Sequence, residues 1–393
     1  MKNPASPLAA LVLGALSVSA QTSPAPTEAR IKFSGQIQIG FTANPQSPQD
    51  HQNFGRLFDD RTNEPMLNQV IWTAEQVLDA KATGFDWGFK FQGMFGSDAR
   101  FTRSVGLLDR ASSLIQPDIV EAFANFHFAV DGTAGGVDLK IGKFVTLAGA
   151  EVIPASGNIF YSHSYIFNFG IPFNHTGVLA TVHATKDMDV MLGLVRGVNT
   201  TRDNNDRPAF HGGVSWPGLL DGKLALTAST HIGPETPHNN RDYRYLSTVV
   251  AIYKINDTLT STTDVNYIRD DAAKAKGYGV AQYFTATLNK TLTANFRAEI
   301  WRDNNGLFVA QIGNNSDLLG FARGDTFTPD PRTVGGGVTT YGAVTVGLTW
   351  KATDTLVVRP ELRYDRALNG TTPFTDSRHQ DMFTVAVDMT LSF

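Results

Sequence analysis

The amino-acid sequence predicts an all-β fold, a transmembrane antiparallel β-barrel of about sixteen strands with short turns at one rim and long loops at the other. Apolar and polar residues alternate in segments of roughly ten residues, the length that a tilted strand needs to cross a bilayer. The connections between these segments are alternately long and short. Aromatic residues gather at both ends of the segments, where a membrane-embedded barrel carries its girdles. These three observations together favour a membrane barrel over a water-soluble sandwich.

The predicted strands follow one another at regular spacing. They span residues 31–41, 67–78, 85–96, 119–129, 137–147, 177–185, 188–198, 209–216, 223–232, 242–255, 258–269, 278–288, 292–302, 338–350, 355–365 and 381–393. Pro360 lies inside one of these segments and removes a ladder hydrogen bond, which indicates either a bulge or an error in the predicted register. The connection 303–337 contains the apolar stretch LFVAQI and is long enough for a further hairpin, so the strand count carries an uncertainty of about two.

The beginning of the chain predicts a secretory signal peptide at residues 1–20. Lys2 precedes the apolar stretch from Leu8 to Ala20, and Val18 and Ala20 stand at the small-residue positions of a cleavage site. We expect export, cleavage near Ala20, a short linker at 21–30 and a barrel over 31–393. An apolar N-terminal helix that docks on the fold is the alternative. No later stretch has the 18 or more apolar residues of a membrane-spanning helix.

Composition narrows the function classes. The chain has no cysteine, so its fold does not depend on disulfides. Lys and Arg number 33 against 37 Asp and Glu, for a formal charge of −4. A nucleic-acid-binding protein would need a basic stripe, which this balance does not supply. We therefore expect no nucleic-acid partner.

Three stretches resemble a known family. They are QNFGRLFDDRTNEPMLNQV at 52–70, SDARFTRSVGLLDR at 97–110 and GNIFYSHSYIFNFGIPFNHTGVLA at 157–180. The chain resembles the OmpL-like β-barrel porins of bacterial outer membranes, most strongly over residues 52–180. The resemblance implies a porin fold in a Gram-negative outer membrane and says little about the solute.

The last strand alternates from Phe383 to Phe393, so its apolar side chains share one face. It must pair with the first strand, because lipid cannot satisfy an open sheet edge. We expect Phe393 in the girdle at the short-turn rim. A C-terminal aromatic strand also resembles the signal that the barrel assembly machinery of the outer membrane reads.

A barrel of about sixteen strands leaves an aqueous channel, because its own side chains cannot fill it. The predicted inward faces of two late strands carry charge, and we take four of these residues as pore-lining candidates: Arg297, Arg359, Glu361 and Arg363. They either line a solvated lumen or form a transverse field that sorts solutes by charge.

The connection 148–176 is the predicted constriction. Its many aromatic and branched residues are too apolar for a free external loop, so it must bury itself. By analogy with trimeric general porins it folds into the barrel; the alternative is packing against a neighbouring subunit. Its ionisable groups, apart from two tyrosines, are Glu151, His163 and His175, which are either constriction residues or parts of a purely structural loop.

The connection 97–118 carries charges of both signs. Asp98, Arg100, Arg103 and Arg110 are candidates for a charged vestibule that concentrates ions at the mouth. The alternative is an internally salt-bridged, solvated loop.

We expect a porin-like channel for passive diffusion of small hydrophilic solutes or ions, with outer-membrane lipids as its surroundings. Analogy with general porins suggests a homotrimer, which no residue pattern establishes. A non-conducting adhesin or structural barrel is the alternative. A barrel enzyme is less favoured, because Ser162, His163 and Ser164 are adjacent rather than on one strand face. No cofactor or metal is expected, since residues 202–208 lack the order of an EF-hand loop.

Overall fold

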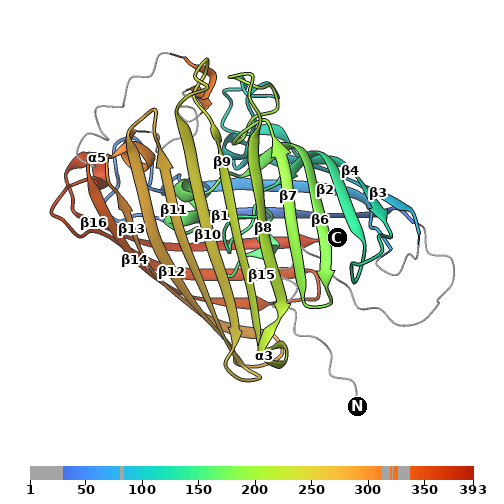
Figure 1. Cartoon of the computed structure of the whole chain (residues 1–393). Helices are drawn as coiled ribbons and strands as arrows, with labels where there is room; N and C mark the ends of the chain where they lie inside the picture. The colour runs from blue at the N-terminus through green and yellow to red at the C-terminus, as the bar shows by residue number, and fades with distance from the viewer. Residues whose placement is uncertain (1–29, 80–83, 312–318, 321, 326–336) are drawn as a thin grey trace.

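The computed structural model describes residues 30–79, 84–311, 319–320, 322–325 and 337–393. Sixteen strands of this part of the chain close into one barrel in which each strand lies beside its sequence neighbours and β1 pairs with β16 (Figure 1). All pairings are antiparallel. The predicted fold class is therefore confirmed. The predicted signal peptide (1–20) and nearly all of the linker (21–30) lie outside the described residues.

The strand bounds are close to the predicted ones. The strands are β1 (Lys32–Ala43), β2 (Pro65–Gln76), β3 (Asp86–Gly96), β4 (Gln116–Phe128), β5 (Val137–Val145), β6 (Asn174–Thr185), β7 (Met188–Val195), β8 (Ala209–Gly218), β9 (Leu224–Pro234), β10 (Tyr243–Lys254), β11 (Leu259–Asp270), β12 (Ala275–Thr287), β13 (Leu292–Asp303), β14 (Thr339–Lys351), β15 (Leu356–Ala367) and β16 (Asp381–Ser392).

Helical structure is confined to single turns in the connections. These turns are α2 (Ala99–Thr102), η2 (Ala155–Gly157), η3 (Ile166–Gly170), α3 (Leu219–Gly222), η4 (Leu307–Gln311) and α5 (Phe374–Ser377). Among the described residues, none of the helices has the length and apolar content that a membrane crossing requires. Leu307–Gln311 of the stretch LFVAQI form the π-helical turn η4, and most of the rest of this connection lies outside the described residues.

Pro360 interrupts the β14–β15 ladder without shifting its register. Gly347 pairs with Glu361 and Trp350 with Val358, so two pairings between them are missing while the register on both sides is the same. Pro360 itself faces outward and is exposed. The N–H that proline lacks costs the ladder pairings at this point only, and the register continues unchanged. Both predicted explanations, a bulge and an error in the register, are therefore wrong.

The barrel closes through a regular seam between β1 and β16. Beyond the paired strands, the Gly35 N–H donates to the Phe393 carbonyl at 2.8 Å, and the Phe393 N–H donates back to the Gly35 carbonyl at 3.0 Å. The Phe393 ring lies over Gly35, where an added Cβ would come within 2.5 Å of it. The closure predicted for the last strand is thus present, and its aromatic ring requires a glycine beneath it.

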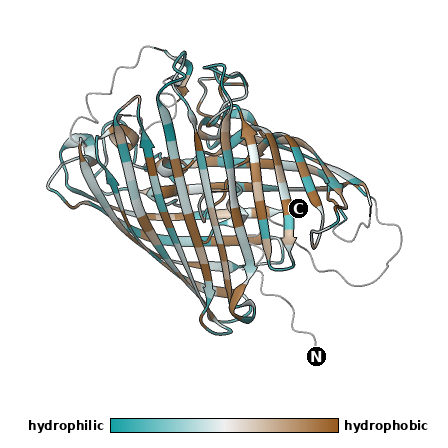
Figure 2. Ribbon diagram, viewed as in Figure 1, coloured by the Kyte–Doolittle hydropathy of each residue, from teal (hydrophilic) through white to brown (hydrophobic). Residues whose placement is uncertain are grey.

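The outer surface of the barrel is apolar, and its polar side chains point mostly inward. Apolar and polar residues alternate along the strands (Figure 2). Along β16 the outward residues from Phe383 to Leu391 are exposed and the inward ones are buried. Exposed aromatics stand at both rims, with Phe33 and Trp350 at the short-turn rim and Phe95 and Tyr278 at the long-loop rim. This pattern matches a lipid-facing band between two girdles.

Candidate functional site

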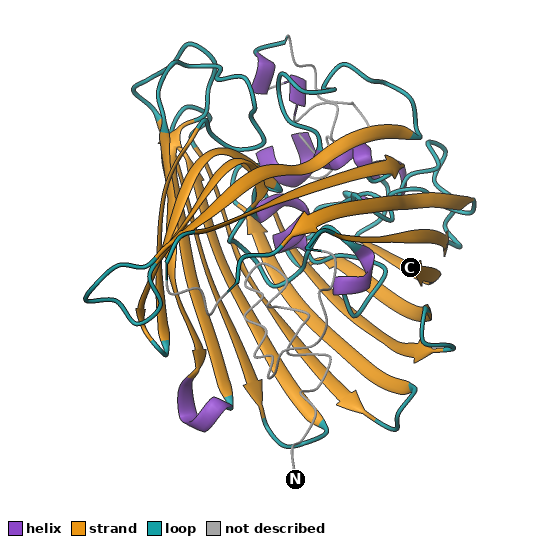
Figure 3. Ribbon diagram, turned by 90° about the vertical axis from the view of Figure 1, so that its right-hand side faces the viewer, coloured by secondary structure: helices purple, strands orange, loops and turns teal. Residues whose placement is uncertain are grey.

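The connection between β5 and β6 lies inside the barrel, and we call residues 146–173 the inward loop. Short helices and loops lie against the inner side of the strands (Figure 3). The loop buries a run of large apolar side chains: Phe160, Tyr161, Tyr165, Ile166, Phe167, Phe169, Ile171 and Phe173. The six from Tyr165 to Phe173 belong to one cluster with inward side chains of the wall, such as Tyr341 of β14. The apolar content that predicted burial of this loop explains its position.

The first anchor of the inward loop is Arg297 on β13. Its guanidinium donates to Glu151 Oε1 at 2.7 Å, to the Ser162 carbonyl at 2.8 Å and to the Ser162 hydroxyl at 3.0 Å. A further hydrogen bond reaches Thr345 Oγ1 on β14 at 3.2 Å. Arg297 is fully buried. One side chain of the wall therefore holds two separate points of the loop.

The second anchor comes from alternate inward positions of β15. The Glu361 carboxylate accepts the Tyr161 N–H at 2.9 Å and the Ser162 N–H at 3.1 Å. Arg363 donates to the His163 carbonyl at 2.5 Å and pairs with Asp365 at 2.8 Å. Because these residues lie two apart on a strand, their side chains share the inward face and meet successive residues of the loop.

The third anchor lies one step nearer the short turns. Arg359 of β15 pairs with Asp388 of β16 and donates to the carbonyls of Ala155 and Asn158. Gln69 of β2 donates to the Ile153 carbonyl at 2.8 Å. Together the three anchors bind the loop to the wall formed by β13–β16, β1 and β2.

The Glu151 carboxylate is the acidic group of the inward loop, and it has several hydrogen-bond partners. Besides Arg297, it accepts the Ser164 N–H at 2.8 Å and the Ser164 hydroxyl at 3.1 Å, and His163 Nδ1 lies 3.3 Å away. Burial acts to raise the pKa of Glu151, but Arg297, His163 and these hydrogen bonds outweigh it and hold the pKa at about 2. Glu151 is therefore a carboxylate at neutral pH.

The first external connection covers the anchored loop from the long-loop side. Arg56 is fully buried and bridges Asp59 and Asp365, each at 2.6 Å. Asp60 in the same connection pairs with Arg100 at 2.6 Å. Ion pairs between three regions far apart in the sequence thus cover one side of the lumen.

The opposite wall, β3–β12, keeps its inward residues partly exposed toward the short turns. Six such residues are Lys90, Asn125, Lys140, Thr181, Thr227 and Thr262. A small cavity of about 50 Å³ separates the inward loop at Glu151 and Ile159 from Thr262 and Thr285 of this wall. Solvent therefore reaches the lumen wall on this side and not beneath the loop.

The predicted constriction and pore-lining residues divide into two groups. Glu151 and His163 meet Arg297 and Arg363 in one buried cluster, and Arg359 and Glu361 hold the same loop. The expectation that the four pore-lining candidates line a solvated lumen is wrong, because the loop covers them. Each is at most 3% exposed: Arg297, Arg359, Glu361 and Arg363. A role for them in constriction stays a prediction.

His175 lies apart from this cluster. It belongs to β6 rather than to the inward loop, and its neighbours are His211 and His231. Nothing in the spacing of these three histidines along the chain indicated that they meet.

The predicted vestibule residues are mostly buried. Asp98 accepts hydrogen bonds from the amides of Asn68 and Gln69, and burial raises its pKa to about 7 against their effect. Arg100 pairs with Asp60 outside its own loop, and Arg103 donates to loop carbonyls. Only Arg110, among the four, is exposed. Asp98 and Arg103 are buried and Arg100 is partly exposed, so a role for the four in a charged vestibule stays a prediction.

Sequence reasoning missed Arg56 and Asp388 as parts of the site. Arg56 lies in a loop, where no periodicity marks its direction, although it falls within the stretch 52–70 that carries the family resemblance. Asp388 stands on the inward face of β16, which the alternation does indicate. Its pairing with Arg359 follows from the β15–β16 register, in which the two residues are direct partners.

Comparisons with known proteins agree with this architecture. Residues 30–393 match the family described as "Putative beta-barrel porin-2, OmpL-like". None of the curated proteins compared with the chain matches it. Similar solved structures include an anion-selective porin from Comamonas acidovorans, with a TM-score of 0.57 and 9% identity, covering 92% of this chain and 99% of that one.

Two further solved structures share the fold. The outer membrane channel DcaP of Acinetobacter baumannii has a TM-score of 0.56 and 10% identity, covering 92% of this chain and 97% of that one. OprB of Pseudomonas putida has a TM-score of 0.58 and 14% identity, covering 92% and 94%. Identities this low make the likeness one of fold.

Proposed function

The chain belongs to the OmpL-like β-barrel porin-2 family, and from that premise we propose that it is a narrow outer-membrane pore that passes small hydrophilic solutes or ions along one side of its barrel. A porin-like outer-membrane channel, rather than an enzyme, is the function that family and fold support. The proposal adds the course of the passage.

One observation supports this course of the passage. The inward loop covers one side of the lumen wall, and inward residues on the other side are partly exposed. The inward loop seals the wall around Arg297, Arg359 and Arg363, which are buried. Across the lumen, Lys140 and Thr262 remain partly exposed. A solute therefore passes between the inward loop and the strands β3–β10, because the loop is hydrogen-bonded to Asp264 and Asn266 of β11.

We propose weak charge selectivity for this passage. Two partly exposed inward charges, Lys90 and Asp138, are paired with buried groups: Lys90 with Glu121, and Asp138 with His127 Nδ1 at 2.7 Å. Paired charges of opposite sign produce little net field along a hydrated passage. Lys140 makes no ion pair within the described part of the chain, and its ammonium lies 4.5 Å from the centroid of the Phe123 ring. It gives the passage a slight preference for anions.

The test is single-channel recording of the purified, refolded protein in a planar lipid bilayer. We expect stable conductance steps and a reversal potential near zero in a salt gradient, displaced slightly toward the value for anions. Folding is confirmed separately by heat-modifiable mobility on a gel. Silent bilayers from folded protein would contradict the proposal.

A non-conducting barrel is the second candidate function. It is favoured by the dense packing of the inward loop, in which the three anchor arginines and their carboxylates are all buried. Such a barrel would act as an adhesin or a structural protein of the outer membrane. A plugged barrel would be identified by two results together. The folded wild type gives silent bilayers, and a variant that lacks the inward loop still folds and shows conductance.

The assignment to an outer-membrane porin family also implies how the chain reaches the membrane. We propose export with cleavage near Ala20, and recognition of the last strand, ending at Phe393, by the assembly machinery. Mass spectrometry of the mature N-terminus tests the cleavage. A homotrimer, by analogy with general porins, is tested by native mass spectrometry in detergent.

A further inference from the structure

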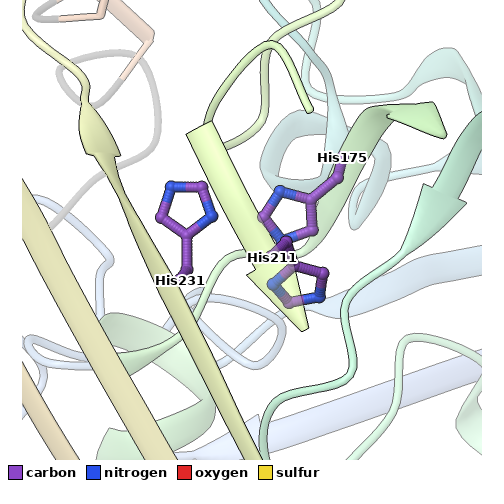
Figure 4. A group of neighbouring side chains, drawn as sticks. All are labelled: His175, His211 and His231. Carbon is purple, nitrogen blue, oxygen red and sulfur yellow. The ribbon is translucent and has the colours of Figure 1, made fainter. Parts of the chain in front are cut away.

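Three histidines from different strands meet inside the barrel wall: His175 on β6, His211 on β8 and His231 on β9 (Figure 4). All three have no exposed surface, and one nitrogen of each lies within 4.8 Å of those of the other two. His211 and His231 are direct partners in the β8–β9 ladder. The ring centroids of His175 and His211 are 4.0 Å apart. The cluster is distinct from the anchors of the inward loop.

Hydrogen bonds fix which nitrogens offer a lone pair. His175 Nδ1 lies 2.9 Å from the Gly197 carbonyl, which only accepts, so Nδ1 carries the proton and Nε2 is free to coordinate. His231 Nε2 lies 2.6 Å from Glu235 Oε1, so by the same argument Nδ1 of His231 holds the lone pair. That nitrogen has no hydrogen-bond partner in the described part of the chain.

The third histidine is held only loosely. The Leu147 N–H donates to His211 Nε2 at 3.3 Å, which places a lone pair on that nitrogen. Thr146 Oγ1 lies 3.3 Å from His175 Nε2. Both contacts are long for hydrogen bonds, and a metal ion can replace both of them.

Packing alone does not account for this arrangement. A buried imidazole nitrogen without a hydrogen-bond partner is destabilising, and Nδ1 of both His211 and His231 lacks such a partner among the described residues. Apart from Glu235 and Thr146, the site includes apolar groups: the Phe144 ring centroid lies 6.4 Å from that of His175, and Phe144 belongs to a buried apolar cluster with Leu179 and Met191. Neutral imidazoles in a dry pocket are suited to a metal ion rather than to a charged organic ligand.

We propose that His175, His211 and His231 bind a divalent transition-metal ion of the zinc type, with Glu235 as the residue that positions His231. The carboxylate–histidine–metal arrangement orients a ligand ring and raises its basicity. Glu235 is itself held, since its second oxygen accepts the Val198 N–H at 2.8 Å. This site goes beyond the proposed channel function and does not depend on it.

The geometry requires only a small closure. Zn–N distances of about 2.0–2.1 Å place tetrahedral nitrogen ligands about 3.4 Å apart, whereas the nitrogens of the cluster lie within 4.8 Å of one another, so the widest pair moves closer by at most about 1.4 Å. Side-chain rotation within the apolar pocket supplies such a shift. Three imidazoles leave the fourth position for water or for Thr146.

The experiment measures Zn²⁺ bound to the full chain made without an affinity tag. Because the rings are buried, refolding is carried out with Zn²⁺ present, and excess metal is removed by dialysis before analysis by inductively coupled plasma mass spectrometry. We expect about one Zn²⁺ per folded chain. The same protein refolded with Co²⁺ gives the visible absorption of a tetrahedral ion.

The variants separate coordination from folding. His231→Ala is expected to lose Zn²⁺ while keeping heat-modifiable mobility, and Glu235→Gln is expected to lower the affinity about 10–100-fold. His183→Ala is the matched control, because His183 also lies on β6 but contacts Asp189 through Nδ1 and Asp138 through Nε2. It is expected to bind Zn²⁺ like the wild type.

The proposal is overturned if the folded wild type retains no Zn²⁺ and shows no Co²⁺ band, or if His231→Ala binds Zn²⁺ as tightly as the wild type. If His231→Ala fails to fold, the Co²⁺ spectrum of the wild type and the affinity of Glu235→Gln decide.

Discussion

Individual side chains of this barrel have functions set by their partners across the lumen. Glu151 is an example. Its position in the loop does not indicate that it pairs with Arg297, which lies 146 residues further along the chain. The acidic and basic groups could be assigned to inward faces from alternation alone. Their pairing required the curvature of the barrel and the course of the inward loop, neither of which is encoded in local periodicity.

Glu151 predicts a specific pH dependence of stability. Its pKa is about 2 in the folded protein against 4.5 ordinarily, so its contribution is present above pH 4.5 and is lost as the pH falls toward 2. Replacement by Gln removes this component and leaves Arg297 with weaker partners, at a cost of roughly 3 kcal/mol. Thermal unfolding, followed by circular dichroism and gel mobility at pH 2–7, measures both effects.

Glu64→Gln is the control for that prediction. Glu64 also pairs with an arginine, Arg61, at 2.6 Å, but its side chain is 40% exposed. An exposed pair contributes about 0–1 kcal/mol, so little change is expected. Equal pH profiles for wild type and Glu151→Gln would show that the buried pair does not stabilise the loop.

Lys140 predicts a change of ion preference. Lys140→Met keeps the aliphatic chain over Phe123 and removes the charge, so the preference for anions should fall. A partly exposed charge contributes about 0.2–1 kcal/mol, which corresponds to a change of roughly 1.4- to 5-fold in the permeability ratio. The reversal potential in a KCl gradient measures it. Lys290→Met, in an exposed turn outside the lumen, should leave the potential unchanged; the reverse result would place the passage elsewhere.

The elements differ in how far the sequence determines them. The strands could be predicted because alternation, turn residues and length all indicate the same structure. The turn η4 and the uninterrupted register around Pro360 could not, because both depend on local hydrogen bonding that period-two patterning does not report. Burial of the inward loop could be predicted from its apolar residues, but the wall to which it binds could not.

The inward loop predicts a clash that can be introduced and relieved. Gly40 on β1 lies under Tyr161, and an added Cβ would come within 2.3 Å of that ring. Gly40→Val should displace Tyr161 and its N–H bond to Glu361, raise the single-channel conductance and cost about 1–3 kcal/mol through overpacking. Urea unfolding and bilayer recording measure the two effects.

Relief of the clash is the check on this prediction. Adding Tyr161→Ala to Gly40→Val removes the ring, so the two substitutions should be less than additive in stability. Strict additivity, or an unchanged conductance in Gly40→Val, would show that Tyr161 does not hold the loop against β1.

At the scale of the whole molecule, a closed barrel follows from the need to satisfy every strand edge in lipid, and the alternation along the chain supplies the lipid-facing and lumen-facing sides. The His175, His211 and His231 cluster and the buried Arg56 bridge are properties of the closed barrel. The histidine cluster joins residues from three strands, and the Arg56 bridge joins a loop with two strands. No shorter segment contains either of them.

The central claim is that the passage runs along the wall opposite the anchored loop. The chain has no cysteine, so single cysteines can be placed at two inward threonines, Thr181 on the partly exposed wall and Thr345, which is buried beneath the loop. A charged thiol reagent is added during single-channel recording. The account predicts that current falls stepwise in Thr181→Cys and is unchanged in Thr345→Cys. Block in Thr345→Cys with no effect in Thr181→Cys would contradict it.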